Sequence, residues 1–214
     1  MVLDFASCEK GDNGTINNDN NNDNGDSSIT FDVSGTIARH DYVDLVLPSC
    51  TKWATCNVGV NQPYDYGDYY VWGEIIAKSN YSGENCPTLG ISMNDISGNI
   101  QYDAATANWG DTWRMSTKTE MEELIDNCTW TWTTQRGVNG YKATGPNGNS
   151  IFLPAAGHCY GSSPYHVGEH GYYWSSTSGE SDVYAACYLG FLSGHHDVYW
   201  GSRAYGCTVR PVSD

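Results

Sequence analysis

Nine short strand-like segments separated by turns and loops recur along this sequence, and a single segment has the periodicity of a helix. The strand-like segments alternate apolar and polar residues, or are rich in aromatic and β-branched residues. They cover residues 42–47, 51–58, 68–76, 129–134, 141–144, 150–153, 172–176, 185–191 and 208–212. Residues 77–111 are rich in Gly and Asn, so we expect long loops there. The pattern predicts an α+β fold with small antiparallel sheets and one or two helices.

The best helix candidate begins after Thr117. Thr117 and Glu120 have the spacing of a capping box, in which the hydroxyl and the carboxylate satisfy exposed backbone N–H groups. Met121, Leu124 and Ile125 follow at helical spacing and give one apolar face. We therefore expect an amphipathic helix packed against the core.

Two Asn-Gly pairs follow the helix, Asn139-Gly140 and Asn147-Gly148, and each is flanked by strand-like residues. Both residue types tolerate positive φ, which makes Asn-Gly the preferred two-residue hairpin turn. The sequence therefore predicts a small antiparallel meander with turns at both pairs.

Residues 11–28 are rich in Asn and Asp and contain no aromatic residue. Such a segment buries too little apolar surface to offset the entropy of ordering, so it is expected to be flexible. The sequence is thus divided into a tether, residues 1–28, and a domain, residues 29–214. An EF-hand calcium loop fails as the alternative, because its first and twelfth positions would be Asn20 and Phe31.

The tetrapeptide Phe5-Ala6-Ser7-Cys8 resembles a bacterial lipobox, in which the Cys is lipidated. An acidic Asn-rich stretch follows it, as in surface lipoproteins of gut Bacteroidetes. We expect lipidation at Cys8 and display at the cell surface as an outer-membrane lipoprotein. Because only seven residues precede Cys8, the start is expected to be truncated. An ordinary cytoplasmic N-terminus with a stray Cys, or display on a phage particle, remains an alternative.

The charge and composition disfavour several classes of partner. A formal net charge of −15 disfavours binding to nucleic acid and to anionic lipid. Contact with a membrane is expected only through the lipid anchor. Charged residues make up 16% of the chain and aromatic residues 13%, which favours an extracellular binding protein.

Eight cysteines are present, but their spacings do not repeat and no CxxC occurs, which argues against a zinc site built from thiolates. An even number of cysteines is compatible with disulfides, and their pairing is left open. No apolar run reaches transmembrane length.

Several blocks of residues occur in a recognisable order between residues 42 and 212. These blocks are YVDLVLPSCTKWATCNVG at 42–59, YGDYYVWGE at 66–74, WRMST at 113–117, GYYWSS at 171–176 and VRPV at 209–212. In this order they resemble the Fibrobacter succinogenes major paralogous domain family. Cys50 and Ser116 depart from it, because a Gly and a Pro are usual at these two places, and the departures concern local turn geometry.

The resemblance implies a C-type-lectin-like fold of the formylglycine-generating-enzyme branch. Some members of that family are targets of diversity-generating retroelements, which rewrite the 3′ end of the gene at template adenines. The resemblance thus implies a stable scaffold with a variable ligand-binding face at about residues 157–207. It does not carry over a calcium site, because the EPN, QPD and WND triplets of calcium-dependent lectins are absent. Nor do Cys187 and Cys207 match the setting of the active cysteine pair.

The composition of the C-terminal segment agrees with this implication. Residues 1–149 contain eighteen Asn and five Lys, whereas residues 150–214 contain neither. The later segment holds five of the six His and half of the sixteen Tyr. Randomised Asn codons yield Tyr, His, Asp, Ser, Gly, Cys, Arg and Ala. Chance drift in composition is the alternative explanation.

We expect residues of this segment to form a face that binds a protein or glycan ligand on another cell or a host surface. Tyr and Trp give rigid contact area at low entropic cost, and Arg203 is a candidate anchor for a ligand carboxylate. Tyr172, Tyr173 and Trp174 are expected to belong to the scaffold, and the protein is expected to be a monomer. The candidate ligand-binding residues are Cys159, Tyr160, Tyr165, His166, Glu169, His170, Asp182, Tyr184, Cys187, Tyr188, His195, His196, Asp197, Tyr199, Trp200, Arg203, Tyr205 and Cys207.

No metal, cofactor or enzymatic activity is expected. His195-His196-Asp197 suggests a metal site, but neighbouring residues on a strand point to opposite faces, so both imidazoles rarely bind one ion. No GxSxG, HExxH or phosphate-binding Gly loop is present. Two alternatives stay open: an enzyme on the same scaffold, either a hydrolase or a formylglycine-generating-like oxidoreductase, and a structural surface protein without a specific ligand.

Overall fold

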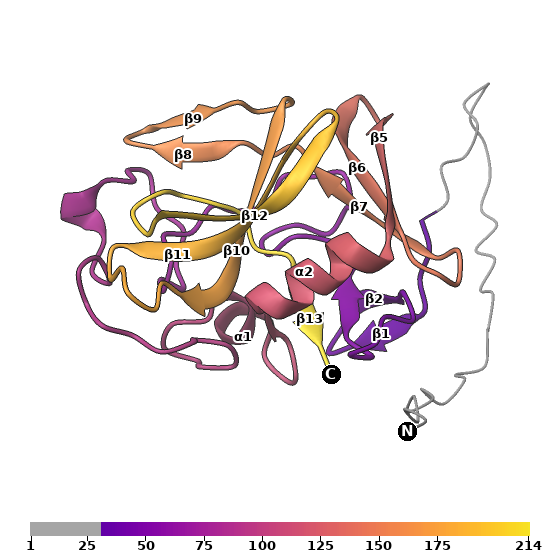
Figure 1. Ribbon diagram of the computed structural model, residues 1–214, viewed down its shortest axis with the longest axis horizontal. Helices are drawn as coiled ribbons and strands as arrows, with labels where there is room; N and C mark the ends of the chain where they lie inside the picture. Colours follow the sequence, from indigo (N-terminus) through magenta and orange to yellow (C-terminus); the bar gives the residue numbers. More distant parts are fainter. Residues whose placement is uncertain (1–30) are drawn as a thin grey trace.

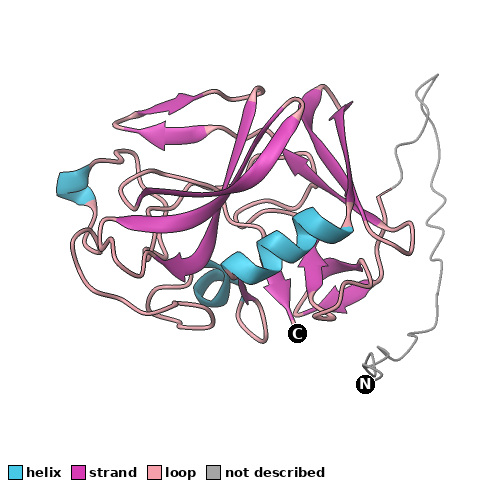
Figure 2. Ribbon diagram, in the orientation of Figure 1, coloured by secondary structure: helices cyan, strands magenta, loops and turns pink. Residues whose placement is uncertain are grey.

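The computed structural model describes residues 31–214, which form an α+β fold of small antiparallel sheets (Figures 1 and 2). The proposed tether, the calcium-loop alternative and the lipidation candidate Cys8 lie outside the described residues. No helix within residues 31–214 is both long enough and apolar enough to cross a membrane.

A five-stranded antiparallel sheet joins the two ends of the described chain. Its strand order is β1-β2-β3-β13-β4. The strands are β1 (Gly35–Ile37), β2 (His40–Asp44), β3 (Lys52–Ala54), β4 (Arg114–Met115) and β13 (Pro211–Ser213). Val212 of β13 pairs with Trp53 on one side and Arg114 on the other. The last strand is therefore needed to complete the sheet that the first three strands begin.

Three smaller sheets stand above the five-stranded sheet in Figure 1. Two are three-stranded meanders and one is a hairpin. The first meander consists of β5 (Thr129–Gln135), β6 (Val138–Thr144) and β7 (Ser150–Pro154). The hairpin consists of β8 (His158–Tyr160) and β9 (Ser163–Tyr165), and the second meander of β10 (His170–Ser178), β11 (Ala185–Leu192) and β12 (His195–Ser202).

Two α-helices occur among the described residues, α1 (Ala104–Trp109) and α2 (Lys118–Asn127), together with a short 3-10 helix, η1 (Gly83–Asn85). The predicted capping box of α2 is confirmed. The Thr117 side chain accepts a hydrogen bond from the Glu120 amide, and the Glu120 side chain accepts one from the Thr117 amide. Helix α1 was not predicted, although its start carries a local capping signal: the Asp103 side chain accepts hydrogen bonds from the amides of residues 105 and 106.

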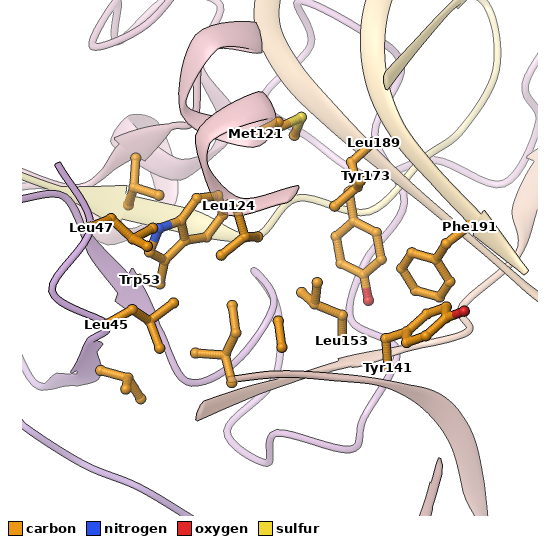
Figure 3. Close-up of a cluster of buried hydrophobic side chains, with 14 of the residues drawn as sticks. Leu45, Leu47, Trp53, Met121, Leu124, Tyr141, Leu153, Tyr173, Leu189 and Phe191 are labelled. Atoms are coloured by element: carbon orange, nitrogen blue, oxygen red, sulfur yellow. The ribbon is translucent and has the colours of Figure 1, made fainter. Parts of the chain in front are cut away.

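The main hydrophobic core lies where α2 meets the sheets (Figure 3). Met121 and Leu124 are the buried apolar side chains of the helix. They pack with Trp53 of the five-stranded sheet, with residues of β6 and β7, and with Tyr173 and Phe191 of the second meander. A second core cluster lies around Trp72 and Trp174, on the other face of β10–β11. The second meander is therefore supported from both faces.

Buried Arg210 ties separate segments of the fold together. Its guanidinium donates to the carbonyls of Ala54 and Thr55 at 3.1 Å, to the Asn57 side chain at 2.8 Å and to the Phe152 carbonyl at 2.9 Å. Burial lowers the pKa of this guanidinium from its ordinary value. The side chain satisfies acceptors that the turn after β3 and the edge of β7 would otherwise leave without partners.

Some predicted strands are shorter than expected or absent. Strand β2 ends at Asp44, whose side chain accepts a hydrogen bond from the Val46 amide at 2.8 Å, and Val46 has a φ of 54°. The segment 68–76 is buried around Trp72 but forms no strand, only an isolated bridge between Tyr70 and Cys207. It passes between other segments without joining a sheet.

The predicted turn at Asn139-Gly140 is wrong, whereas Asn147-Gly148 does lie in the loop between β6 and β7. The turn between β5 and β6 is at Arg136 and Gly137, with φ values of 50° and 82°. Gly140 lies inside β6, where a Cβ would stand 2.3 Å from the Leu153 carbonyl oxygen. Glycine is therefore required at this position for the close approach of β7, not for a turn.

Cys50 also illustrates a local turn requirement. Its φ is 59°, in the left-handed region that favours Gly. Gly, which adopts this conformation without strain, is the residue usual at this place in the family that the sequence resembles.

Candidate functional site

Ten aromatic rings form a continuous series of contacts across β8 to β12, which we call the aromatic band. Neighbouring rings have centroids between 4.6 and 6.2 Å apart. Such spacings are typical of favourable aromatic pairs. The members of the band are His158, Tyr160, Tyr165, His166, His170, Tyr172, Tyr188, His195, Tyr199 and Tyr205.

The pairing of β11 with β12 sets one half of the aromatic band. Tyr188 is the direct partner of Tyr199, and their ring centroids are 5.7 Å apart. Gly190 and Gly201 leave room for these rings, because a Cβ at either position would come within 2.8 Å of a tyrosine ring atom. The Tyr188 ring also packs edge-on against buried Trp174, at 5.9 Å and 88°. This half of the band rests on the second core cluster and is held in a fixed arrangement.

His158 connects the rings of the other half of the aromatic band. Its ring lies 4.7 Å from Tyr172, 5.3 Å from Tyr205 and 6.0 Å from His166. Burial, followed by the nearby imidazoles of His166 and His170, lowers the pKa of His158 below its ordinary value. Its Nδ1 atom is buried and has no hydrogen-bond partner within the described part of the chain. His158 is therefore a neutral ring at the centre of the band.

A shallow hollow of about 210 Å³ opens in the aromatic band. Its walls include His170, Tyr172, Tyr188, His195 and Tyr199. Burial raises the pKa of the Tyr172 and Tyr188 hydroxyls, so both stay protonated at neutral pH and act as neutral hydrogen-bonding groups. The hollow is smaller than pockets that enclose a whole small molecule, which are about 300–1,000 Å³. It suits one side chain or one sugar ring of a larger ligand.

The region around the aromatic band has no exposed Lys or Arg from its own segment. Residues 150–214 contain no Lys, and their two arginines, Arg203 and Arg210, are buried. Exposed Glu169 and Asp197 add negative charge beside the band. The face is thus aromatic with a weakly acidic border.

The structure brings eight of the candidate ligand-binding residues into the aromatic band and places Glu169 at its edge. These eight are Tyr160, Tyr165, His166, His170, Tyr188, His195, Tyr199 and Tyr205. Asp197 shares the His195 and Tyr199 side of β12, in keeping with the two-residue period of a strand. Asp182 and Tyr184 are exposed in the loop before β11, outside the chain of ring contacts.

His196 and Trp200 lie on the opposite side of β12 from the aromatic band, because side chains alternate along a strand. The His196 ring stacks on Trp130 at 4.5 Å and 15°. His195 instead contacts the Tyr199 hydroxyl. The two imidazoles therefore face different ways, as the alternation predicts.

Arg203 is not a ligand anchor, which corrects the sequence-based expectation. Its side chain is fully buried and donates to the carbonyls of Ala185, Thr88 and Ile91 at 2.8–3.0 Å. The guanidinium also lies over the Trp72 ring at 4.4 Å. Arg203 therefore connects the loop after β12 to the loop around residue 90.

Cys159, Cys187 and Cys207 are likewise buried and cannot contact a ligand from the surface, contrary to expectation. Burial raises the pKa of the Cys159 and Cys187 thiols to about 11. All three are free thiols. Protonated, buried thiols are poor nucleophiles, so these residues serve as small apolar groups of the scaffold.

Sequence reasoning missed His158 and Tyr172 as members of the aromatic band. Tyr172 was assigned to the scaffold with Tyr173 and Trp174, and only the latter two are buried as expected. Alternation along β10 supplies the missing signal, because it separates Tyr172 from Tyr173. Nothing in the sequence near His158 indicates its four ring partners.

One group of ligand-forming side chains in the described chain has a spacing suited to a metal ion: His166, Glu169 and His170. It lies in the turn between β9 and β10, at the edge of the aromatic band. The sequence pattern did not indicate this group.

A larger groove of about 880 Å³ lies among the loops of residues 73–102. Its charged side chains are engaged with one another or with the scaffold. Glu74 pairs with Lys78 at 2.6 Å, and Asp95 accepts from the Ser97 amide and the Thr177 hydroxyl at 2.9 Å. The groove is thus large, but its Glu74, Lys78 and Asp95 side chains already have partners within the described chain.

A family model matches the part of the chain that carries the aromatic band. It is described as a domain of unknown function, DUF8237, and it matches residues 111–212, just under half of the chain. The match runs from immediately before β4 into β13 and leaves out the large groove. No curated protein and no solved structure matches the chain.

Proposed function

We propose that this chain is a ligand-binding protein with a C-type-lectin-like fold, which recognises a protein or glycan through the aromatic band. The observation that carries the proposal is the continuous set of ten rings, five of which lie on the second meander, a sheet supported by core clusters on both faces. Tyr side chains bring large contact area with only two rotatable bonds, so little entropy is lost on binding. Rings already held by neighbours lose even less.

The charges beside the aromatic band narrow the class of ligand. Residues 150–214 contribute no exposed Lys or Arg to this face, and the chain has a net charge of −15, so the face is expected to repel phosphate and sulfate groups. Aromatic rings favour the apolar face of a sugar ring, or apolar and cationic side chains of a protein. We therefore propose a neutral glycan or a neutral-to-basic protein surface as ligand.

The division between rigid scaffold and exposed rings also supports diversification by a retroelement. The C-terminal segment without Asn contributes all ten rings of the aromatic band. Most of its His and Tyr reach the surface, where substitution does not disturb the core. We propose that these exposed positions vary among sibling genes while the buried Arg203 and Cys207 do not.

We further propose that the protein acts as a monomer displayed on a cell surface through a lipid at Cys8. A phage particle is the other place of display that would serve the same function. An enzyme using the groove of residues 73–102 is the alternative function, and the engaged charges of that groove give it less support.

The neighbouring DNA and the sibling genes test this proposal together. We expect a reverse-transcriptase gene and an imperfect repeat of the 3′ end that differs at template adenines. Substitutions among siblings are expected to concentrate at exposed positions such as Tyr160, His195 and Tyr199. Sibling genes that are invariant at these positions, with no such repeat nearby, would contradict diversification and favour an enzyme or a structural protein.

A further inference from the structure

We propose that the turn between β9 and β10 binds a divalent transition-metal ion of the zinc class, with His166, Glu169 and His170 as its three protein ligands. Two imidazoles and one carboxylate are a ligand set used by zinc sites that keep an open position. The site does not depend on the function proposed above, because the three ligands lie together whether or not the aromatic band binds a partner.

The ligand atoms are already close together. One nitrogen of each histidine and one carboxylate oxygen all lie within 4.8 Å of one another. His166 Nδ1 is 3.7 Å from Glu169 Oε2. Two ligands at about 2.0 Å from a tetrahedral ion are about 3.3 Å apart, so small side-chain movements complete the geometry.

The backbone holds these three residues on one side of the turn. The amides of Glu169 and His170 both donate to the His166 carbonyl, at 3.1 and 2.9 Å. These two bonds close a tight, non-helical turn, since Gly168 inside it has a φ of 81°, and the turn brings the three side chains together. His166 adopts a φ of 57°, which directs the chain into the turn.

Hydrogen bonds to the scaffold keep the turn in place. The Gly157 amide donates to the His170 carbonyl, and the Gly168 amide donates to the Ala155 carbonyl, both at 2.7 Å. A Cβ at position 157 would stand 2.1 Å from the Tyr165 carbonyl oxygen, so only glycine permits this approach. The turn is therefore attached to the segment between β7 and β8, so the backbone that carries the metal ligands does not have to be ordered on binding.

A neighbouring side chain orients one ligand. His170 Nδ1 lies 3.2 Å from the Tyr172 hydroxyl. Metal-bound histidines usually hydrogen-bond through the nitrogen that does not touch the metal, which fixes the orientation of the ring. The contact with Tyr172 leaves His170 Nε2 for the ion.

The chemistry of the ligands selects the class of ion. Imidazole suits zinc, copper and nickel, whereas calcium and magnesium prefer oxygen ligands. The site adjoins the aromatic band, because the His158 ring lies 6.0 Å from that of His166. An ion there would add positive charge to a face that has no exposed Lys or Arg from its own segment, and would offer an open position to a carboxylate or imidazole of a partner.

Metal titration of the full chain without an affinity tag tests the site. Zn²⁺ binding is measured by calorimetry, and Co²⁺ binding by its visible absorption, which reports tetrahedral coordination. We expect one ion per chain. His166→Ala, Glu169→Gln and His170→Ala should each weaken binding about tenfold or more, since each removes a ligand or its charge.

Matched controls separate this site from nonspecific binding by histidines. His195→Ala and His196→Ala remove imidazoles outside the turn, and both should bind Zn²⁺ like the unaltered chain. Tyr199→Ala alters the aromatic band but keeps the three metal-binding side chains, so this variant should also bind Zn²⁺ normally. The Zn²⁺ result would therefore stand even if the aromatic band bound no glycan or protein. The proposal is overturned if Zn²⁺ does not bind, or if binding survives unchanged in both His166→Ala and His170→Ala.

Discussion

Replacing Arg210 by Met is expected to lower the free energy of unfolding by about 3 kcal/mol, the largest effect on stability that we predict. Met has a similar length and stays apolar, but it donates no hydrogen bonds. The carbonyls of Ala54, Thr55 and Phe152 and the Asn57 side chain lose their donor, and water cannot reach them. Loss of the buried charge offsets a part of this cost.

Thermal and urea unfolding of Arg210→Met measure the effect. For a domain of this size the melting temperature should fall by roughly 6–12 °C. Lys118→Met is the control, because Lys118 is a partly exposed cation whose ion pair with Glu122 contributes at most about 1 kcal/mol. Equal unfolding free energies for the two variants would show that the buried guanidinium does not hold β3 and β7 together.

The double variant Tyr199→Ala, Tyr205→Ala is expected to weaken ligand binding by about a hundredfold or more. These rings lie in the two halves of the aromatic band, and truncation of a central aromatic contact commonly costs about 2 kcal/mol. Both side chains reach solvent, so the fold should be retained. The ligand is a glycan or peptide selected with the unaltered chain from a glycan array or a displayed peptide library.

The control for this variant is Tyr184→Ala, Trp200→Ala. It removes two exposed aromatic side chains, 59% and 48% exposed, that lie outside the aromatic band. Its affinity should stay within about twofold of the unaltered chain, since rim and distant residues contribute little. Comparable losses in both double variants would mean that binding does not depend on the aromatic band.

Two local signals in the sequence were read correctly. The capping box at Thr117 and the apolar spacing of Met121 and Leu124 depend only on residues within one or two helical turns, and the structure confirms both. The separation of His195 from His196 depends only on alternation along a strand. These features need no knowledge of the rest of the chain.

Features that depend on distant segments were missed or read wrongly. Gly140 belongs to a strand because the Leu153 carbonyl approaches it, and Arg203 is buried because carbonyls more than a hundred residues earlier accept its hydrogen bonds. His158 and Tyr172 meet only through the relative placement of β8 and β10. From the sequence alone, an Arg is expected to be exposed and an Asn-Gly pair is expected to form a turn. Only the long-range contacts show that both expectations fail here.

Hydroxyl-radical footprinting of the protein, with and without bound ligand, tests the central claim most directly, because the method reports the solvent exposure of individual aromatic side chains. Saturating ligand is expected to protect Tyr160, Tyr199 and Tyr205 from oxidation, while Tyr184 and Trp200 react as they do in the free chain. Protection of Tyr184 or Trp200, with the aromatic band as reactive as before, would contradict the account.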